Sequence, residues 1–133
     1  MKNFITYELA AKLQEKGFGE KCIGHYESTG AFYLNSIDTY YRPNQELDYN
    51  DFLKCFNEGN SIGLIDAPTI SQVLNWLRKE KKLHIITPAS SDGEYWWEVR
   101  DFNRGISEYR DDLFDTYEKA TLAGIEYVLD NLI

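Results

Sequence analysis

The alternation of apolar and polar side chains is clearest over residues 67–87. Four aliphatic residues recur at helical spacing and share one face: Ile70, Val73, Leu74 and Leu77. Trp76 falls at the border of that face, and Thr69 with Gln72 forms a capping-box pattern at the start. Four bases occupy the end, where the helix dipole favours positive charge: Arg78, Lys79, Lys81 and Lys82. The stretch predicts a capped helix that leads into a strand at 83–87.

Helical patterns also lie near both ends of the chain. Thr6 is placed to cap a first helix that ends at Gly17, with an inner side made by Leu9, Ala10 and Leu13. Asp115 with Glu118 is the predicted cap pair of a last helix that runs to about residue 132. Its predicted inward stripe is Tyr117, Ala120, Thr121, Gly124, Ile125, Val128 and Leu132.

Shorter alternating segments predict strands. Residues 21–26 and 31–37 flank a turn at 27–30, which indicates a hairpin. Residues 83–87 and 94–102 flank a second turn at 90–93, and 106–114 is a candidate further strand. We therefore expect an α+β fold: one domain over 1–133, with an antiparallel or mixed sheet of four to five strands built from two hairpins. Three main helices pack on that sheet, and 38–66 is an irregular or partly helical insertion with a short helix near 48–59.

Composition is consistent with a folded domain. The chain has 133 residues, of which 43% are hydrophobic and 15% aromatic. No apolar run approaches the roughly 20 residues that a membrane span requires, and the N-terminus has no signal-peptide pattern. We expect a cytoplasmic protein without a membrane segment. Its two cysteines, Cys22 and Cys55, are then expected to be reduced thiols rather than a disulfide.

The net charge of −8 is distributed unevenly along the sequence. Residues 1–88 carry a net charge of −1, whereas residues 89–133 carry −7. Phosphate contacts require clustered Lys and Arg, so the acidic balance argues against direct binding of nucleic acid.

Three segments carry a resemblance to a known group of proteins. They are Ile-Thr-Tyr-Glu-Leu-Ala-Ala-Lys-Leu at 5–13, Ala-Pro-Thr-Ile-Ser-Gln-Val-Leu-Asn-Trp-Leu-Arg at 67–78, and Thr-Tyr-Glu-Lys-Ala at 116–120. The chain resembles small proteins of gut Bacteroidetes prophages and mobile elements, which are similar to phage proteins grouped as an α-β-α sandwich domain. The resemblance covers most of the chain except about 38–62. It implies a fold and a genomic setting but no activity.

Residues with catalytic or metal-binding potential are few. Cys22 and His25 suggest a metal site, completed by Cys55 and His84. Strand residues three apart point to opposite faces, however, so we expect a packed cysteine and a surface histidine, with no metal. No nucleophile elbow, phosphate-binding loop or zinc-protease motif is present, and we assign no catalytic residue or cofactor. Asp111, Asp112 and Asp115 fit a solvated loop that leads into a helix N-terminus.

Five aromatic residues lie outside the predicted core: Tyr26, Tyr33, Tyr40, Tyr41 and Trp96. If these side chains are grouped on one face, they would form a protein-binding surface. If they are scattered, they are half-buried residues at the edges of the fold and have no function of this kind. The candidate partner-binding surface therefore consists of Tyr33, Tyr40, Tyr41, Trp96, Asp111, Asp112 and Asp115.

Two function classes follow from this pattern. The favoured one is a non-enzymatic accessory protein of a phage or mobile element that binds another protein or a second copy of itself. A variant of it is an acidic inhibitor that mimics DNA and occupies a host nucleic-acid enzyme. The other class is an enzyme whose site the sequence does not reveal.

Overall fold

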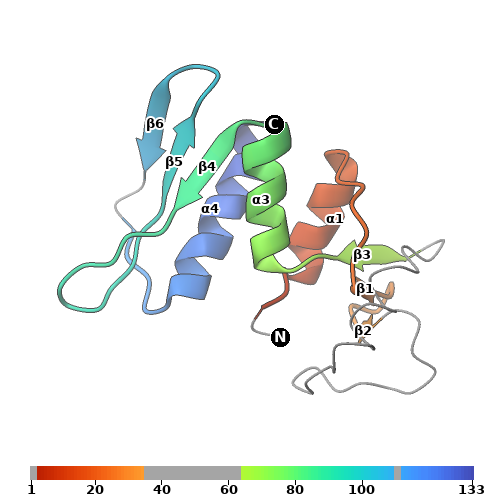
Figure 1. The fold of residues 1–133 in the computed structure, drawn as a ribbon. Coiled ribbons are helices and arrows are strands. Elements are labelled where there is room, and N and C mark those ends of the chain that lie inside the picture. The colour runs from red at the N-terminus through yellow and green to blue at the C-terminus, as the bar shows by residue number, and fades with distance from the viewer. Residues whose placement is uncertain (1–2, 35–63, 110–111) are drawn as a thin grey trace. The chain divides into compact units, whose positions relative to one another are not determined.

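The computed structural model describes residues 3–34, 64–109 and 112–133 (Figure 1). The chain divides into two compact units, Met1–Ile70 and Ser71–Ile133, and each is described by itself. The expected α+β class is confirmed. Within the described residues, however, the strands form two antiparallel sheets of three strands each, ordered β2-β1-β3 and β4-β5-β6, and not one sheet of four to five. Among the described residues, no helix has the length and apolarity needed to span a membrane.

The N-terminal unit begins with helix α1 (Tyr7–Glu15). The Thr6 hydroxyl accepts a hydrogen bond from the Leu9 backbone N–H at 3.3 Å, so the predicted cap is confirmed. The predicted inner residues of α1 are buried: Leu9, Ala10 and Leu13. Gly17 has a positive φ of 89° just after the helix, a conformation that glycine adopts without a Cβ clash.

The sheet of this unit consists of β1 (Gly24–Tyr26), β2 (Phe32–Leu34) and β3 (Ile65–Ala67). The predicted β1–β2 hairpin is present, with its first strand shorter than the expected 21–26 and with residues 35–37 outside the described part. The Gly30 N–H donates to the Glu27 carbonyl at 2.8 Å in the predicted turn. Tyr26, expected outside the core, is buried. Its hydroxyl donates to the Ile5 carbonyl at 2.6 Å, and its ring packs edge-on against Tyr7 and Phe32. A tyrosine can be buried in a core when its hydroxyl has a hydrogen-bond partner. The alternation of side chains along a strand does not show whether such a partner exists.

The C-terminal unit contains most of helix α3 (Ile70–Glu80). Ile70, Val73 and Leu77 are buried as predicted. Trp76 is also buried, whereas Leu74 is half-buried, so the indole and not Leu74 belongs to the inward face. The indole of Trp76 has more apolar surface than the side chain of Leu74, so burying Trp76 gives the larger hydrophobic free energy.

The sheet of this unit contains β4 (Leu83–Ile86), β5 (Glu98–Asp101) and β6 (Ile106–Tyr109). The predicted hairpin of 83–87 with 94–102 is present, but its second strand is shorter than expected. Before Glu98 the hairpin register continues as an isolated bridge between Tyr95 and Ala89. The Tyr95 backbone also exchanges hydrogen bonds with Phe114, at 2.8 and 2.7 Å. The predicted strand at 106–114 is likewise limited to β6, with Phe114 in the isolated bridge to Tyr95.

Helix α4 (Tyr117–Asn131) covers one face of this sheet, chiefly β4 and β5. Thr116, not Asp115, is the N-cap, and its hydroxyl accepts from the Lys119 N–H at 3.1 Å. Gly124 lies so close to the sheet that an added Cβ would come within 3.1 Å of Ile85 and 3.2 Å of Trp97. Tyr117, predicted to face inward, is exposed, with its ring edge-on against that of Tyr95 and the centroids 6.3 Å apart. The short helix expected near 48–59 lies outside the described residues.

Substitutions on α3 test the revised face assignment. We expect Leu77→Ala to lower the free energy of unfolding by about 2–5 kcal/mol, because it removes a fully buried side chain and leaves a cavity. Leu74→Ala should cost less, since Leu74 is half-buried, and Lys79→Ala should cost less than about 1 kcal/mol. Urea unfolding of the three variants measures this order. Equal losses for Leu77 and Leu74 would contradict the assignment.

Candidate functional site

The exposed large apolar side chains of the described residues all come from one short segment, 102–117. Their exposed fractions are 57% for Phe102, 45% for Ile106, 65% for Tyr109, 54% for Leu113 and 46% for Tyr117. Single exposed apolar residues are common on protein surfaces, but several in one short segment make that segment a candidate for interaction. We call Ile106, Tyr109, Leu113 and Tyr117 the β6 surface.

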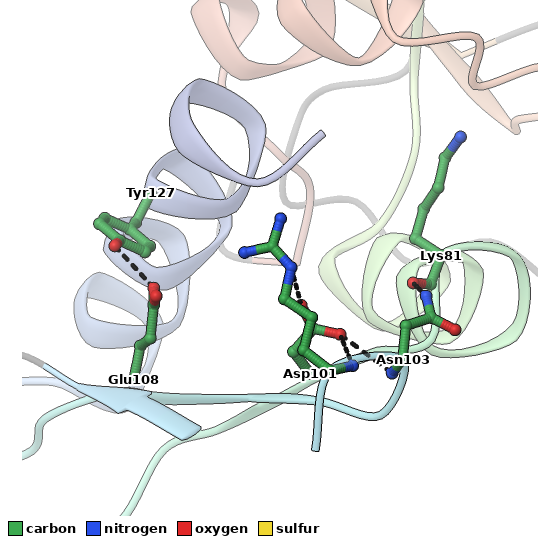
Figure 2. Close-up of polar contacts among 6 residues, drawn as sticks. Lys81, Asp101, Asn103, Glu108 and Tyr127 are labelled. Carbon is green, nitrogen blue, oxygen red and sulfur yellow. Dashed lines mark hydrogen bonds and ion pairs between the residues drawn. The ribbon is translucent and has the colours of Figure 1, made fainter. Parts of the chain in front are cut away.

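The position of β6 in the sheet explains this exposure. Among the described strands, β6 pairs with β5 alone and is therefore an edge strand. Ile106 lies opposite Asp101 and Tyr109 opposite Glu98, so the two apolar side chains point to opposite faces of the sheet. Helix α4 reaches β6 through the Tyr127 hydroxyl, which donates to the Glu108 carboxylate at 2.7 Å (Figure 2).

Carboxylates accompany the apolar residues. Asp112 and Asp115 are exposed and lie in the segment that joins β6 to α4. Lys119 holds Asp115 at 2.9 Å, and its hydrogen bond and charge hold the pKa of the Asp115 carboxyl below its ordinary value. The surface is therefore apolar and acidic at the same time.

The sequence-predicted site residues fall in different places. Asp112 and Asp115 border the β6 surface, and Trp96 belongs to the same unit, half-buried, with its indole N–H donating to Glu98 at 3.3 Å. Tyr33 belongs to the N-terminal unit, on β2. Tyr40, Tyr41 and Asp111 lie outside the described residues.

The sequence pattern does not reveal the apolar members of the β6 surface. It places Tyr117 on the inward stripe of the last helix, and it gives residues 106–114 as a candidate further strand. One signal for exposure is present: 106–109 is the last strand before the final helix, and the last strand of a meander lies at an edge.

A row of titratable side chains crosses the N-terminal sheet. His25 pairs with Tyr33 on one side and with Asp66 on the other, and its ring stacks on Tyr33 with centroids 5.6 Å apart. One carboxylate oxygen of Asp66, Oδ1, is buried without a hydrogen bond. Burial raises the pKa of Asp66, and the charge of His25 opposes part of that rise.

Cys22 is a buried thiol outside any disulfide, and it donates to the Glu20 carbonyl at 3.4 Å. Burial, with smaller contributions from Asp66 and Glu20, raises the pKa of Cys22 to about 12. A thiol of this kind is a poor nucleophile at neutral pH, so the expected packed cysteine is confirmed. His25 is half-buried and not a surface residue. Within 3–34, 64–109 and 112–133, no group of three or more His, Cys, Asp or Glu has a geometry that could hold a metal ion.

Protein-family models, curated protein sequences and solved structures were all compared with this chain, and none of them matches it.

The buried carboxyl of Asp66 predicts a pH-dependent effect on stability. The pKa of Asp66 in the folded chain lies above the ordinary 3.8, so the folded state binds more protons than the unfolded state at a pH between the two values. The free energy of unfolding therefore falls as the pH rises from the ordinary pKa to the raised one. Asp66→Asn removes the ionisation, so its stability relative to the native chain should increase from pH 4 to pH 7. Urea unfolding across this range is the measurement, with Asp112→Asn as an exposed control. A constant difference between Asp66→Asn and the native chain would contradict the prediction.

Proposed function

We propose that this chain is a non-enzymatic accessory protein that works by binding another protein through the β6 surface. The observation that carries the proposal is the clustering of exposed large apolar side chains on one edge strand and the segment after it. The resemblance to phage and mobile-element proteins supports a role in that genomic setting.

The chemistry of the β6 surface indicates what kind of partner fits. Tyrosine is enriched at the energetically dominant positions of protein interfaces, because its ring buries apolar area while its hydroxyl keeps a polar contact. Tyr109 and Tyr117 provide two such side chains, and Leu113 lies between them in the sequence. The neighbouring Asp112 and Asp115 favour a partner that presents basic residues around an apolar centre.

The edge of β6 adds a backbone contribution. A strand without a second neighbour presents unpaired N–H and C=O groups, which an extended segment of a partner can pair with. Side chains on both faces of such an added strand would meet exposed apolar residues, Ile106 on one face and Tyr109 on the other.

The apolar part of the surface is tested by substitution after affinity capture has identified a partner. The double variant Tyr109→Ser, Leu113→Ser should weaken binding roughly tenfold or more, as truncation of central interface residues does. Both side chains are exposed, so the melting temperature should stay close to that of the native chain. Tyr33→Ser, in the other unit, is the control. Loss of binding in the control, with none in the double variant, would move the interface to the N-terminal unit.

The acidic part is tested by charge reversal. We expect Asp112→Lys with Asp115→Lys to slow association with the partner, and the native association rate to fall as salt is added. Asp92→Lys with Glu94→Lys makes the same change of net charge in the β4–β5 turn and should have a smaller effect. Stopped-flow or biosensor kinetics give the rates. Equal slowing by both pairs would show that only the net charge of the chain matters.

A further inference from the structure

The charges of the C-terminal unit are separated in space. Residues 78–84 and 100–106 together carry six bases and two acids, a net charge of +4. The rest of residues 71–133 carries two bases and ten acids, a net charge of −8. The net acidity of the unit therefore conceals a basic region made from two segments that are about 20 residues apart in the sequence.

The fold joins these two segments at one end of the sheet. The Phe102 N–H donates to the Lys82 carbonyl at 3.0 Å, and the Asn103 side-chain amide donates to the Lys81 carbonyl at 3.4 Å (Figure 2). His84 lies directly opposite Arg100 in the pairing of β4 with β5. We call the resulting cluster the basic end: Arg78, Lys79, Lys81, Lys82, Arg100 and Arg104.

One acid of this region pairs with a base of the basic end. Asp101 is nearly buried, accepts backbone N–H groups from Asn103 and Arg104 at 3.0 and 3.1 Å, and lies 3.5 Å from the Arg104 side chain. Glu80 is the other acid of the two segments. Lys82 and Arg100 are exposed, and within the part of the chain that the structure describes neither side chain has a hydrogen bond or an ion pair.

The dipole of α3 explains part of the basic end but not all of it. Arg78 and Lys79 lie in the last turn, where the dipole favours positive charge. Arg100 and Arg104 come from β5 and the turn that follows it, so the same argument does not apply to them. The basic end therefore combines bases from α3 with bases from β5 and the turn after it.

An exposed aromatic ring lies within this cluster. Phe102 is 57% exposed, and its ring is tilted against His84 with the two centroids 6.0 Å apart. Bases that follow a nucleic-acid backbone, combined with an exposed ring on which a nucleobase stacks, are the two elements of single-strand binding.

We propose that the basic end binds single-stranded nucleic acid, with phosphates on Lys82 and Arg100 and an unpaired base on Phe102. A duplex would leave the ring without a free base face, and an acidic peptide would meet the charges but give the ring no base to stack on. The expectation that the chain does not bind nucleic acid rests on its net charge. Because the charges of this unit are separated in space, the net charge does not describe the local charge of the basic end. Binding is expected at about 10⁻⁴–10⁻⁶ M, the usual range for contacts without base readout.

The charge contribution is tested by fluorescence anisotropy with a labelled oligodeoxythymidylate of about 12 nucleotides. Lys82→Glu with Arg100→Glu should weaken binding at least tenfold and reduce the salt slope by about 0.7 for each phosphate that is no longer neutralised. Lys21→Glu with Lys119→Glu makes the same change of net charge at residues that are not part of the basic end, and should keep most of the affinity. Equal weakening in both pairs, or no binding by the native chain, would overturn the proposal.

The stacking contribution is tested separately. Phe102→Ala should weaken binding roughly fivefold or more, whereas Tyr109→Ala, which removes an exposed ring outside the basic end, should not. Both residues are exposed, and thermal melts check that the variants remain folded. Tighter binding of a duplex of the same length, or equally effective competition by polyglutamate, would overturn the single-strand assignment in favour of a duplex or an acidic protein.

Discussion

The close packing of α4 on the inner face of β4 and β5 is the constraint on which the C-terminal unit depends. At Gly124 the helix backbone approaches Ile85 and Trp97 so closely that there is little space for a Cβ. One turn earlier, the Thr121 hydroxyl lies 2.8 Å from that of Thr87, which gives a buried polar atom a partner across the same contact. Among the described strands, α4 contacts β4 and β5 most, and Ile106 and Tyr109 on the edge strand β6 remain exposed.

Local patterns predicted the elements whose determinants are local. The Thr6 cap, the two hairpin turns and the α3 repeat depend on residues a few positions apart, and all of them are present in the structure. The number of sheets was not predictable in the same way. It depends on which strands meet across long sequence separations, and strand alternation indicates that a strand exists without indicating its neighbour. Tyr95 illustrates the difficulty, since its backbone bridges Ala89 in the hairpin and also bonds the distant Phe114.

The candidate site shows the same division. The sequence indicated acids near Asp112 and Asp115, and the structure places both beside exposed apolar residues. Which aromatic residues are exposed could not be read from alternation, because that depends on the cover given by distant elements. Tyr26 is buried since its hydroxyl reaches the backbone of Ile5, whereas Tyr117 is exposed although it fits a helical stripe. The two basic segments were likewise visible only as separate charges until β4 and β5 paired.

The placement of the indole rings has a practical consequence for spectroscopy. All three tryptophans of the chain, Trp76, Trp96 and Trp97, belong to the C-terminal unit, whereas the N-terminal unit has tyrosine as its largest chromophore. Trp97 packs with its ring 4.8 Å from that of Tyr127, inside the contact between sheet and helix. Emission excited at the red edge of the absorption band therefore reports on one unit alone. Comparing it with backbone circular dichroism would reveal whether the two units of this chain lose their structure together or one after the other.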